Sequence, residues 1–299
     1  MKKLLYQKIR VLFLFLPVLS GLYACNDTIG GPPVSASQHF RQDWAMDPLW
    51  DQGDAEVAIY DARRMVYGEA RSFEYAFILV KETFNEEFKV KADDYSRSDL
   101  FEVMKINKFC RIPTDNYPYH YLTSIFYLRQ QPSTVYKLTN TSQEWCGNTS
   151  KYFLHEGEQY RFGYNSYWDG QGIGETSVQG DIMFEDQLSH SLRALNFQEG
   201  LTFRQAVAES QVNSKAEKPK IYDARFSISR ADDLILQTGY ETGQEEIWKV
   251  SVQLDDEKTS HYWFSGTYPN LLLKQESWNG RSYELKEHKM DAYWERGSS

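Results

Sequence analysis

The sequence predicts an all-β, mostly antiparallel protein, built as a curved sheet, half-barrel or barrel with one short helix. Aromatic residues make up 15% of the chain, and such side chains suit the half-buried faces of strands. Many segments alternate apolar and polar residues with a period of two, and turn residues separate these segments. Strands do not alternate regularly with helices, which favours a barrel, half-barrel or sandwich over a parallel sheet.

The last fifty residues give the clearest strand signal. The segment "EIWKVSVQL" (246–254) places Trp248, Val250 and Val252 on one face of a strand. The dipeptide Asn279 and Gly280 favours a type I′ hairpin turn between two further strand-like segments. The sequence therefore predicts an antiparallel meander at this end of the chain.

Strand pairs are also expected earlier, at 57–68 with 71–82, at 123–131 with 133–141, and within 151–168. Segments 189–197 and 201–212 are less regular, and the second is compatible with a strand or a short helix. One helix is predicted from a capping box at 96–99, followed by apolar residues at helical spacing up to Asn107. The motif "IYDAR" occurs at 59–63 and again at 221–225.

The N-terminus predicts export and a lipid anchor. Residues 1–24 combine four basic residues with a short apolar run, the pattern of a secretory signal. Residues 22–25, "LYAC", resemble the lipobox of bacterial lipoproteins, although Tyr23 departs from the usual small residue. The resemblance implies that Cys25 is acylated; the alternative is an ordinary signal in which Cys25 is incidental. We expect a signal peptide at 1–24, a lipidated flexible tether at 25–47 and one β-rich domain at 48–296.

The net charge and the cysteines limit which partners and which disulfides are expected. The formal net charge is −9 although the first 24 residues are basic, so the exported body is acidic and nucleic acid is an unfavourable partner. Periplasm-facing outer membrane is the expected location. In an oxidising compartment Cys110 and Cys146 are candidates for a disulfide, and two unpaired thiols are the alternative.

No catalytic or cofactor motif was found in the sequence. The nucleophile elbow, the phosphate-binding loop and the H-E-x-x-H zinc motif do not occur, and the six histidines are scattered, so we expect no metal and no cofactor. A polysaccharide hydrolase would need two converging carboxylates. Its candidates are Asp181, Glu185 and Asp186, with Tyr167 and Trp168 available to stack on a sugar. A non-enzymatic role is the favoured interpretation.

Two segments rich in aromatic and polar residues, 113–121 and 142–149, lie near the two cysteines. Their side chains could rim an apolar ligand cavity. The alternative is that these loops only seal one end of a barrel. The candidate rim residues are Tyr117, Tyr119, His120, Tyr121 and Trp145.

Residues 93–129 and 141–151 resemble a group of uncharacterised Gram-negative envelope proteins, some labelled "septum formation inhibitor Maf". True Maf proteins carry an S-x-S-P-R-R motif, which this chain lacks, so that activity is rejected. Residues 248–294 resemble a second group, periplasmic proteins expected to share the half-barrel of lipoprotein carriers. This resemblance implies an apolar groove that binds lipid or lipoprotein. The hypothesis is a non-enzymatic outer-membrane lipoprotein that binds an apolar ligand or an envelope partner; the alternatives are a polysaccharide hydrolase and a purely structural lipoprotein.

Overall fold

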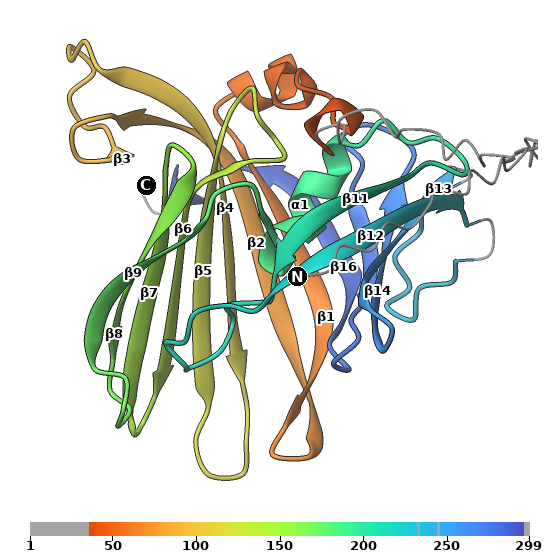
Figure 1. The fold of residues 1–299 in the computed structure, drawn as a ribbon. Helices are drawn as coiled ribbons and strands as arrows, with labels where there is room; N and C mark the ends of the chain where they lie inside the picture. Colours follow the sequence, from red (N-terminus) through yellow and green to blue (C-terminus); the bar gives the residue numbers. More distant parts are fainter. Residues whose placement is uncertain (1–35, 232–233, 244–245, 296–299) are drawn as a thin grey trace, which may run out of the picture. The chain divides into compact units, whose positions relative to one another are not determined.

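The computed structural model describes residues 36–231, 234–243 and 246–295. The predicted signal peptide and Cys25 lie outside these residues. Within them, sixteen strands form one open, curved sheet (Figure 1), which confirms the predicted fold class. The strands are β1 (Ala55–Val66), β2 (Glu69–Asn85), β3 (Val90–Lys91), β4 (Leu100–Ile112), β5 (Tyr119–Leu128), β6 (Val135–Glu144), β7 (Gly147–Glu156), β8 (Gln159–Ser166), β9 (Ile173–Gln179), β10 (Met183–Phe184), β11 (Thr202–Ala208), β12 (Ile221–Arg230), β13 (Ile247–Asp255), β14 (Lys258–Ser265), β15 (Leu272–Glu276) and β16 (Ser282–Asp291).

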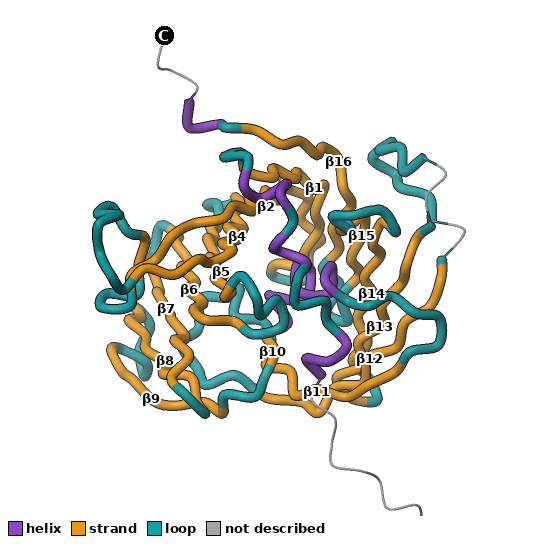
Figure 2. The backbone as a smooth tube through the Cα atoms, turned by 90° about the horizontal axis from the view of Figure 1, so that it is seen from above, coloured by secondary structure: helices purple, strands orange, loops and turns teal. Residues whose placement is uncertain are grey.

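The sheet order is β10-β11-β12-β13-β14-β15-β16-β1-β2-β4-β5-β6-β7-β8-β9, with β3 paired to β2. All these pairings are antiparallel except β10 with β11. The two ends of the sheet, β9 and β10, follow each other in the chain with only residues 180–182 between them. The strands therefore surround a central region (Figure 2), and a short chain segment joins the two ends of the sheet.

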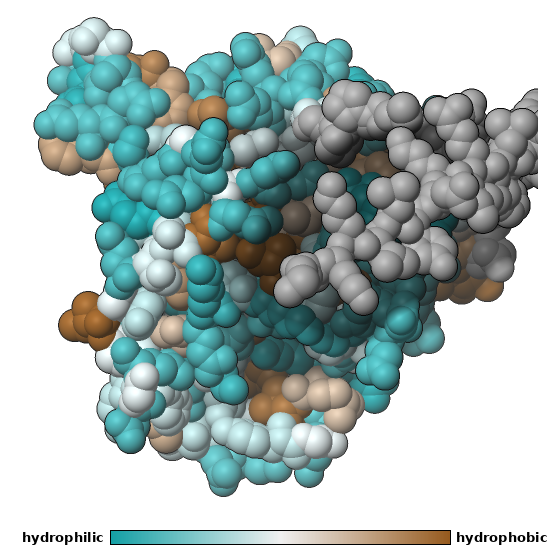
Figure 3. Space-filling view, in the orientation of Figure 1, coloured by the Kyte–Doolittle hydropathy of each residue, from teal (hydrophilic) through white to brown (hydrophobic). Residues whose placement is uncertain are grey.

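Helix α1 (Glu185–Ser191) lies in this central region, and all seven of its residues are buried. It continues into the 3₁₀ helix η4 (Leu192–Ala194). The Gln187 side chain accepts a hydrogen bond from the Phe184 N–H at 2.8 Å, which caps the first turn. Apolar side chains from most of the strands pack with α1 in one core cluster. Figure 3 shows one side of the molecule, where the surface is mostly hydrophilic and apolar side chains are visible toward the middle.

Three 3₁₀ helices, η1 (Ala36–His39), η2 (Trp44–Met46) and η3 (Pro48–Asp51), pack at one end of the sheet. Phe40, Trp44 and Trp50 are almost fully buried there. Residues 36–47, assigned to the tether from the sequence, therefore belong to the folded unit. The segment is mostly polar, but Phe40 and Trp44 anchor it to the core.

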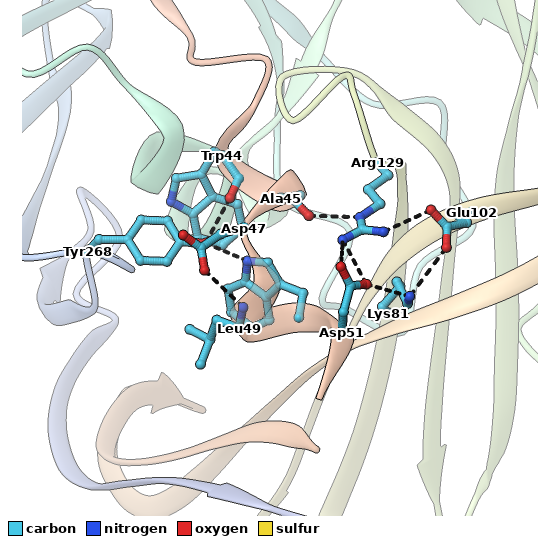
Figure 4. Close-up of polar contacts among 10 residues, drawn as sticks. Trp44, Ala45, Asp47, Leu49, Asp51, Lys81, Glu102, Arg129 and Tyr268 are labelled. Carbon is cyan, nitrogen blue, oxygen red and sulfur yellow. Dashed lines mark hydrogen bonds and ion pairs between the residues drawn. The ribbon is translucent and has the colours of Figure 1, made fainter. Parts of the chain in front are cut away.

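Polar contacts fix this segment in place (Figure 4). Arg129 donates to the Ala45 carbonyl at 2.8 Å and to the Asp51 and Glu102 carboxylates at 2.9 and 2.8 Å. Lys81 also contacts Asp51. Hydrogen bonds from Arg129 and Lys81 lower the pKa of Asp51. The Arg129 guanidinium joins η2, η3 and β4. This end of the sheet is therefore held by ion pairs as well as by aromatic packing.

The helix predicted after residues 96–99 is wrong. Residues 100–112 form β4, which pairs with β2 and β5 along most of its length. The same residues also alternate with a period of two, which places Met104, Ile106 and Lys108 on the buried face. Pairing with two strands outweighs the local helical pattern. The capping-box serine, Ser96, instead donates to Asp94 in a turn.

The other segment predictions mostly agree with the structure. The C-terminal meander is confirmed as β13 to β16. The type I′ turn predicted at Asn279 and Gly280 is wrong: Gly280 has a φ of 77°, but Asn279 is not among the residues with a positive φ, and residues 277–281 form a longer loop between β15 and β16. Residues 202–208 form strand β11, which settles the alternative left open for 201–212. Part of the uncertain segment 189–197 is helical, in α1 and η4. Among the described residues, no helix has the length and apolar character needed to span a membrane.

Candidate functional site: an outer groove and an aromatic rim

A row of apolar side chains crosses the outer face of the sheet. Ile59 on β1 lies opposite Ala76 on β2, Ala76 lies opposite Phe109 on β4, and Phe109 lies opposite Leu122 on β5. Their chain neighbours, such as Cys110 and Tyr121, are buried on the inner face, because successive side chains of a strand point to opposite faces. The row therefore faces away from the core.

These residues line a hollow of about 840 Å³, which we call the outer groove. The outward-facing residues that line the groove are Ile59, Glu74, Ala76, Phe109, Arg111, His120, Leu122, Thr141 and Gln143; Cys110 and Tyr121, whose side chains belong to the inner core, also border it. Phe109 is 45% exposed and Leu122 is 42% exposed, so two large apolar side chains of adjacent strands meet solvent side by side. A contiguous apolar surface of this kind is a common mark of a binding site.

A polar row runs beside the apolar one. Arg111 lies opposite His120, and His120 lies opposite Gln143. These residues are two positions along their strands from the apolar row and so lie on the same face. Glu74 also lines the groove. The groove thus presents a strip of hydrocarbon next to hydrogen-bonding and charged groups. This arrangement suits a molecule with an apolar chain and a polar end.

The inner face beside α1 offers much less space. Lys108 on β4 donates to the Asp186 carbonyl and the Ser189 hydroxyl of α1, so the helix is fixed to the sheet. The hollow that remains beside Lys108, Asp186 and Arg281 measures about 20 Å³, which is enough for roughly one water molecule. The resemblance to lipoprotein carriers implied an acyl-binding concave face, but here that face is filled by α1 and by aromatic side chains.

The carboxylates considered for hydrolysis hold a loop in place. Ser210 and Gln211 donate their backbone N–H groups to Glu185 at 2.9 Å and to Asp186 at 2.6 Å. Ser210 Oγ also donates to Asp186, and Trp278 Nε1 donates to Glu185 at 3.0 Å. Burial raises the pKa of Glu185. Every oxygen of the two carboxylates accepts a protein hydrogen bond, and the third candidate, Asp181, is exposed and accepts from Gln205.

Aromatic side chains form two neighbouring groups of rings at the other end of the sheet from η1, η2 and η3. Together the two groups cross the ends of four successive hairpins, β1–β2, β4–β5, β6–β7 and β8–β9, along the lower edge of Figure 1. We call the two groups together the aromatic rim; its members are Tyr67, Tyr117, Tyr119, Trp145, Tyr167 and Trp168. Neighbouring rings lie 5.4–6.2 Å apart between the Tyr67–Tyr119, Tyr119–Tyr117, Tyr117–Trp145 and Tyr167–Trp168 pairs.

Close packing continues the rim from Trp145 to the next hairpin. A Cβ atom at Gly147 would lie only 2.3 Å from the Tyr167 ring, so the Tyr167 ring packs directly on the backbone beside Trp145. Three rim side chains are largely exposed: Tyr67 (77%), Trp145 (78%) and Tyr167 (61%). The rim is therefore an open edge of ring faces and not a closed pocket.

The structure brings together three of the five rim residues predicted from the sequence, Tyr117, Tyr119 and Trp145. Tyr121 lies deeper, stacked 6.4 Å from Tyr119 on the inner face. His120 points to the opposite face and lines the outer groove, because it alternates with its neighbours along β5.

Sequence reasoning did not place Tyr67, Tyr167 and Trp168 in the rim. Tyr67 occupies the β1–β2 turn with a φ of 54°, and nothing local connects it to residues fifty positions away. Tyr167 and Trp168 were noted only as possible sugar-stacking residues. The order of the hairpins along the chain is the signal that places these residues together, because alternate turns of an antiparallel meander lie at the same end of the sheet.

The two cysteines are free thiols in the structure. Cys110 is buried on the inner face of β4, and burial raises its pKa to about 12. Cys146 is exposed and donates its S–H to the Tyr117 hydroxyl at 3.3 Å. The described residues contain no group of three His, Cys, Asp or Glu side chains that could hold a metal ion.

No protein-family model and no curated protein matches this chain. Two solved structures are similar in fold. One is described as a β-barrel-like protein of the domain of unknown function DUF1849 from Brucella abortus; it is 9% identical with a TM-score of 0.47, and the match covers 80% of this chain and 98% of that one. The other is a DUF1089 family protein from Pseudomonas aeruginosa, 11% identical with a TM-score of 0.31, covering 56% of this chain and 82% of that one. At these identities and TM-scores neither similarity carries an argument about this chain.

Proposed function

We propose that this protein is a non-enzymatic lipoprotein of the outer membrane that binds an amphiphilic lipid in the outer groove. Acylation of Cys25 would hold it at the periplasmic side of the membrane. The observation that carries the proposal is the apolar row from Ile59 to Leu122 on the outer face, in which Phe109 and Leu122 are exposed and which is flanked by the polar row.

The dimensions and chemistry of the groove support a lipid chain. Its volume of about 840 Å³ falls within the range of roughly 300–1,000 Å³ that is usual for small-ligand sites. Covering the exposed parts of Phe109 and Leu122 would contribute about 1 kcal/mol each. Arg111, His120 and Gln143 stand at the edge of the same hollow, where they could bind a carboxylate or a headgroup.

Two further features favour this function over the alternatives. Helix α1 occupies the inner face, and the hollow left beside it at Lys108 measures only about 20 Å³, which favours the outer groove for a ligand of this size. The Glu185 and Asp186 carboxylates are engaged by Ser210, Gln211 and Trp278, which disfavours a hydrolase that would use them. A purely structural lipoprotein would have no need of a groove with adjacent apolar and polar rows.

The ligand can be identified by purifying the full chain carrying Cys25→Ser from a periplasm and analysing it by native mass spectrometry with lipid extraction. We expect one lipid per chain. A variant with Phe109→Asp and Leu122→Asp should lose the lipid, because both changes place charge on the apolar row. Ile173→Asp is the matched control, since Ile173 is an exposed aliphatic residue outside the groove. A lipid-free parent chain, or a lipid retained by the double variant, would contradict the proposal.

The anchor is tested separately. The unaltered chain should fractionate with the outer membrane, and the Cys25→Ser chain should appear in the soluble periplasmic fraction. If the Cys25→Ser chain remains membrane-bound, acylation of Cys25 does not hold the protein at the membrane.

A further inference from the structure

The aromatic rim lies outside the outer groove, and nothing in the proposed function uses it. Three largely exposed rings, Tyr67, Trp145 and Tyr167, lie on separate hairpins of one edge, with Tyr117 and Trp168 partly exposed between them. Isolated exposed aromatic residues are common on protein surfaces, whereas exposed rings gathered on the adjoining ends of four hairpins are a common mark of a binding surface.

The rings of the rim are held in position before any ligand binds. The hydroxyls of Tyr67 and Tyr119 are hydrogen-bonded, and Tyr117 accepts a hydrogen bond from Cys146. Trp145 is stacked on Tyr117 with an interplanar angle of 23°. Tyr167 packs on Gly147, where any larger residue would displace it. A surface ordered in this way loses little conformational entropy when a ligand settles on it.

Polar groups lie among the rings. Arg71 on β2 donates to both oxygens of Asp115, at 2.9 and 2.7 Å, on the loop that carries Tyr117. Glu144 precedes Trp145, and burial raises the pKa of its carboxyl group. Ring faces next to charged and hydroxyl groups suit pyranose sugars, whose C–H faces pack on aromatic rings while their hydroxyl edges form hydrogen bonds.

We propose that the aromatic rim binds a neutral glycan strand of the cell envelope. The open edge spans several hairpins and so fits an extended chain better than a single small molecule. The acidic charge of the body favours a neutral strand over a polyanionic one.

A bilayer surface is the main competing partner for exposed tyrosine and tryptophan, and the position of the rim disfavours it. This step rests on the anchor at Cys25. The described chain begins at Ala36, which shares a hollow with Thr134 at the end of the sheet opposite the rim. Strand β6 has ten residues from that end to the rim, about 33 Å at roughly 3.3 Å per residue. Residues 25–35 reach at most about 39 Å, so rim contact with the anchoring membrane would need a nearly fully extended tether.

The test uses the full chain carrying Cys25→Ser and two neutral probes: insoluble chitin in a co-sedimentation assay, and a soluble chito-oligosaccharide in a tryptophan-fluorescence titration. We expect binding to both. Trp145→Ala should weaken binding more than about tenfold, and Trp145→Phe should retain most of it. Trp294→Ala is the matched control, because Trp294 is an exposed tryptophan that also packs against a tyrosine, Tyr293.

Three results would overturn the proposal: no binding by the parent chain, equal binding by Trp145→Ala, or rim-dependent binding to phosphatidylethanolamine vesicles and not to the glycans. Because Trp145 is largely exposed, the variants should fold, and circular dichroism checks that they do. The lipid content of the outer groove is measured independently in each variant. Failure of glycan binding would therefore leave the lipid-binding function untouched, and the converse also holds.

Discussion

The two faces of the central strands β4 and β5 differ in how much apolar side-chain surface they expose. On the inner face, Ile106, Lys108 and Ile125 are buried against α1 and its neighbours. On the outer face, Phe109 and Leu122 remain more than 40% exposed, although they lie on the same two strands. In a curved sheet the concave face is the usual place for a ligand. Here that face is packed like a protein interior, and the open apolar surface is on the outside.

The inner face should therefore be sensitive to changes that the outer face tolerates. The largest effect is expected at the buried ion pair between Arg193 on η4 and Glu56 on β1, where two hydrogen bonds of 2.7 Å join the groups. Arg193→Ala leaves Glu56 buried without its cation, and we expect a loss of about 3–5 kcal/mol in the free energy of unfolding. Urea denaturation measures it; a loss below about 1 kcal/mol would show that the interior is not tightly packed around this pair.

A matched pair of leucines compares the two faces directly. Leu138 on β6 is fully buried on the inner face, and Leu122 on β5 is on the outer face. Leu138→Ala should lower the free energy of unfolding by about 2–5 kcal/mol, because it leaves a cavity. Leu122→Ala should cost less than about 1 kcal/mol. Urea denaturation measures both losses. Similar losses in the free energy of unfolding would show that the inner face is not packed more tightly than the outer face.

Low pH should reduce the free energy of unfolding through protonation of Glu56. Burial alone would raise the pKa of this carboxyl, but Arg193 and His288 outweigh burial and lower it to about 2. A carboxyl whose pKa is lower in the folded state stabilises the fold above its unfolded pKa, near 4.5, and this contribution is lost as pH falls toward 2. We expect a loss on the order of 3 kcal/mol over that range. Chemical denaturation at several pH values measures it, and Glu56→Gln should flatten this part of the pH dependence.

The smallest expected effect is a difference in reactivity between the exposed thiol of Cys146 and the inner-face thiol of Cys110. Cys146 is exposed, so it should react with a maleimide within minutes in the native protein. Cys110 is buried on the inner face and its pKa is raised to about 12, so it should react only after unfolding. Mass spectrometry of the modified protein counts the labels. If neither thiol reacts, even after unfolding, until a reductant is added, the two cysteines form a disulfide.

Much of the fold follows from local patterns. Alternation and turn residues correctly indicated the β1–β2, β5–β6 and β7–β8 hairpins and the C-terminal meander. The segment 100–107 was mistaken for a helix because its apolar spacing fits both periods, and only its pairing with β2 and β5 decides between them. The extent of the folded unit was also misjudged, since the burial of Phe40 and Trp44 depends on distant residues.

The candidate sites were less predictable than the fold. The outer groove depends on the register of five strands, which brings Ile59 and Leu122 into one row across a sequence separation that no local pattern spans. The rim was partly foreseen, because Tyr117 and Trp145 lie in unusual aromatic loops. The role of α1 was not foreseen: residues 185–191 look polar, and their burial depends on partners such as Lys108 and Ser210 elsewhere in the chain.

The central claim is that the ligand binds on the outer face and not inside the barrel. The most direct measurement is photo-crosslinking of the full chain carrying Cys25→Ser with a photoactivatable palmitate analogue, followed by peptide mapping. We expect crosslinks on the outer-groove strands, at residues such as Ala76, Phe109 and Leu122, and their loss on competition with unlabelled palmitate. Crosslinks confined to α1 or to inner-face residues such as Phe153 and Tyr262 would contradict it and place the ligand in the barrel interior.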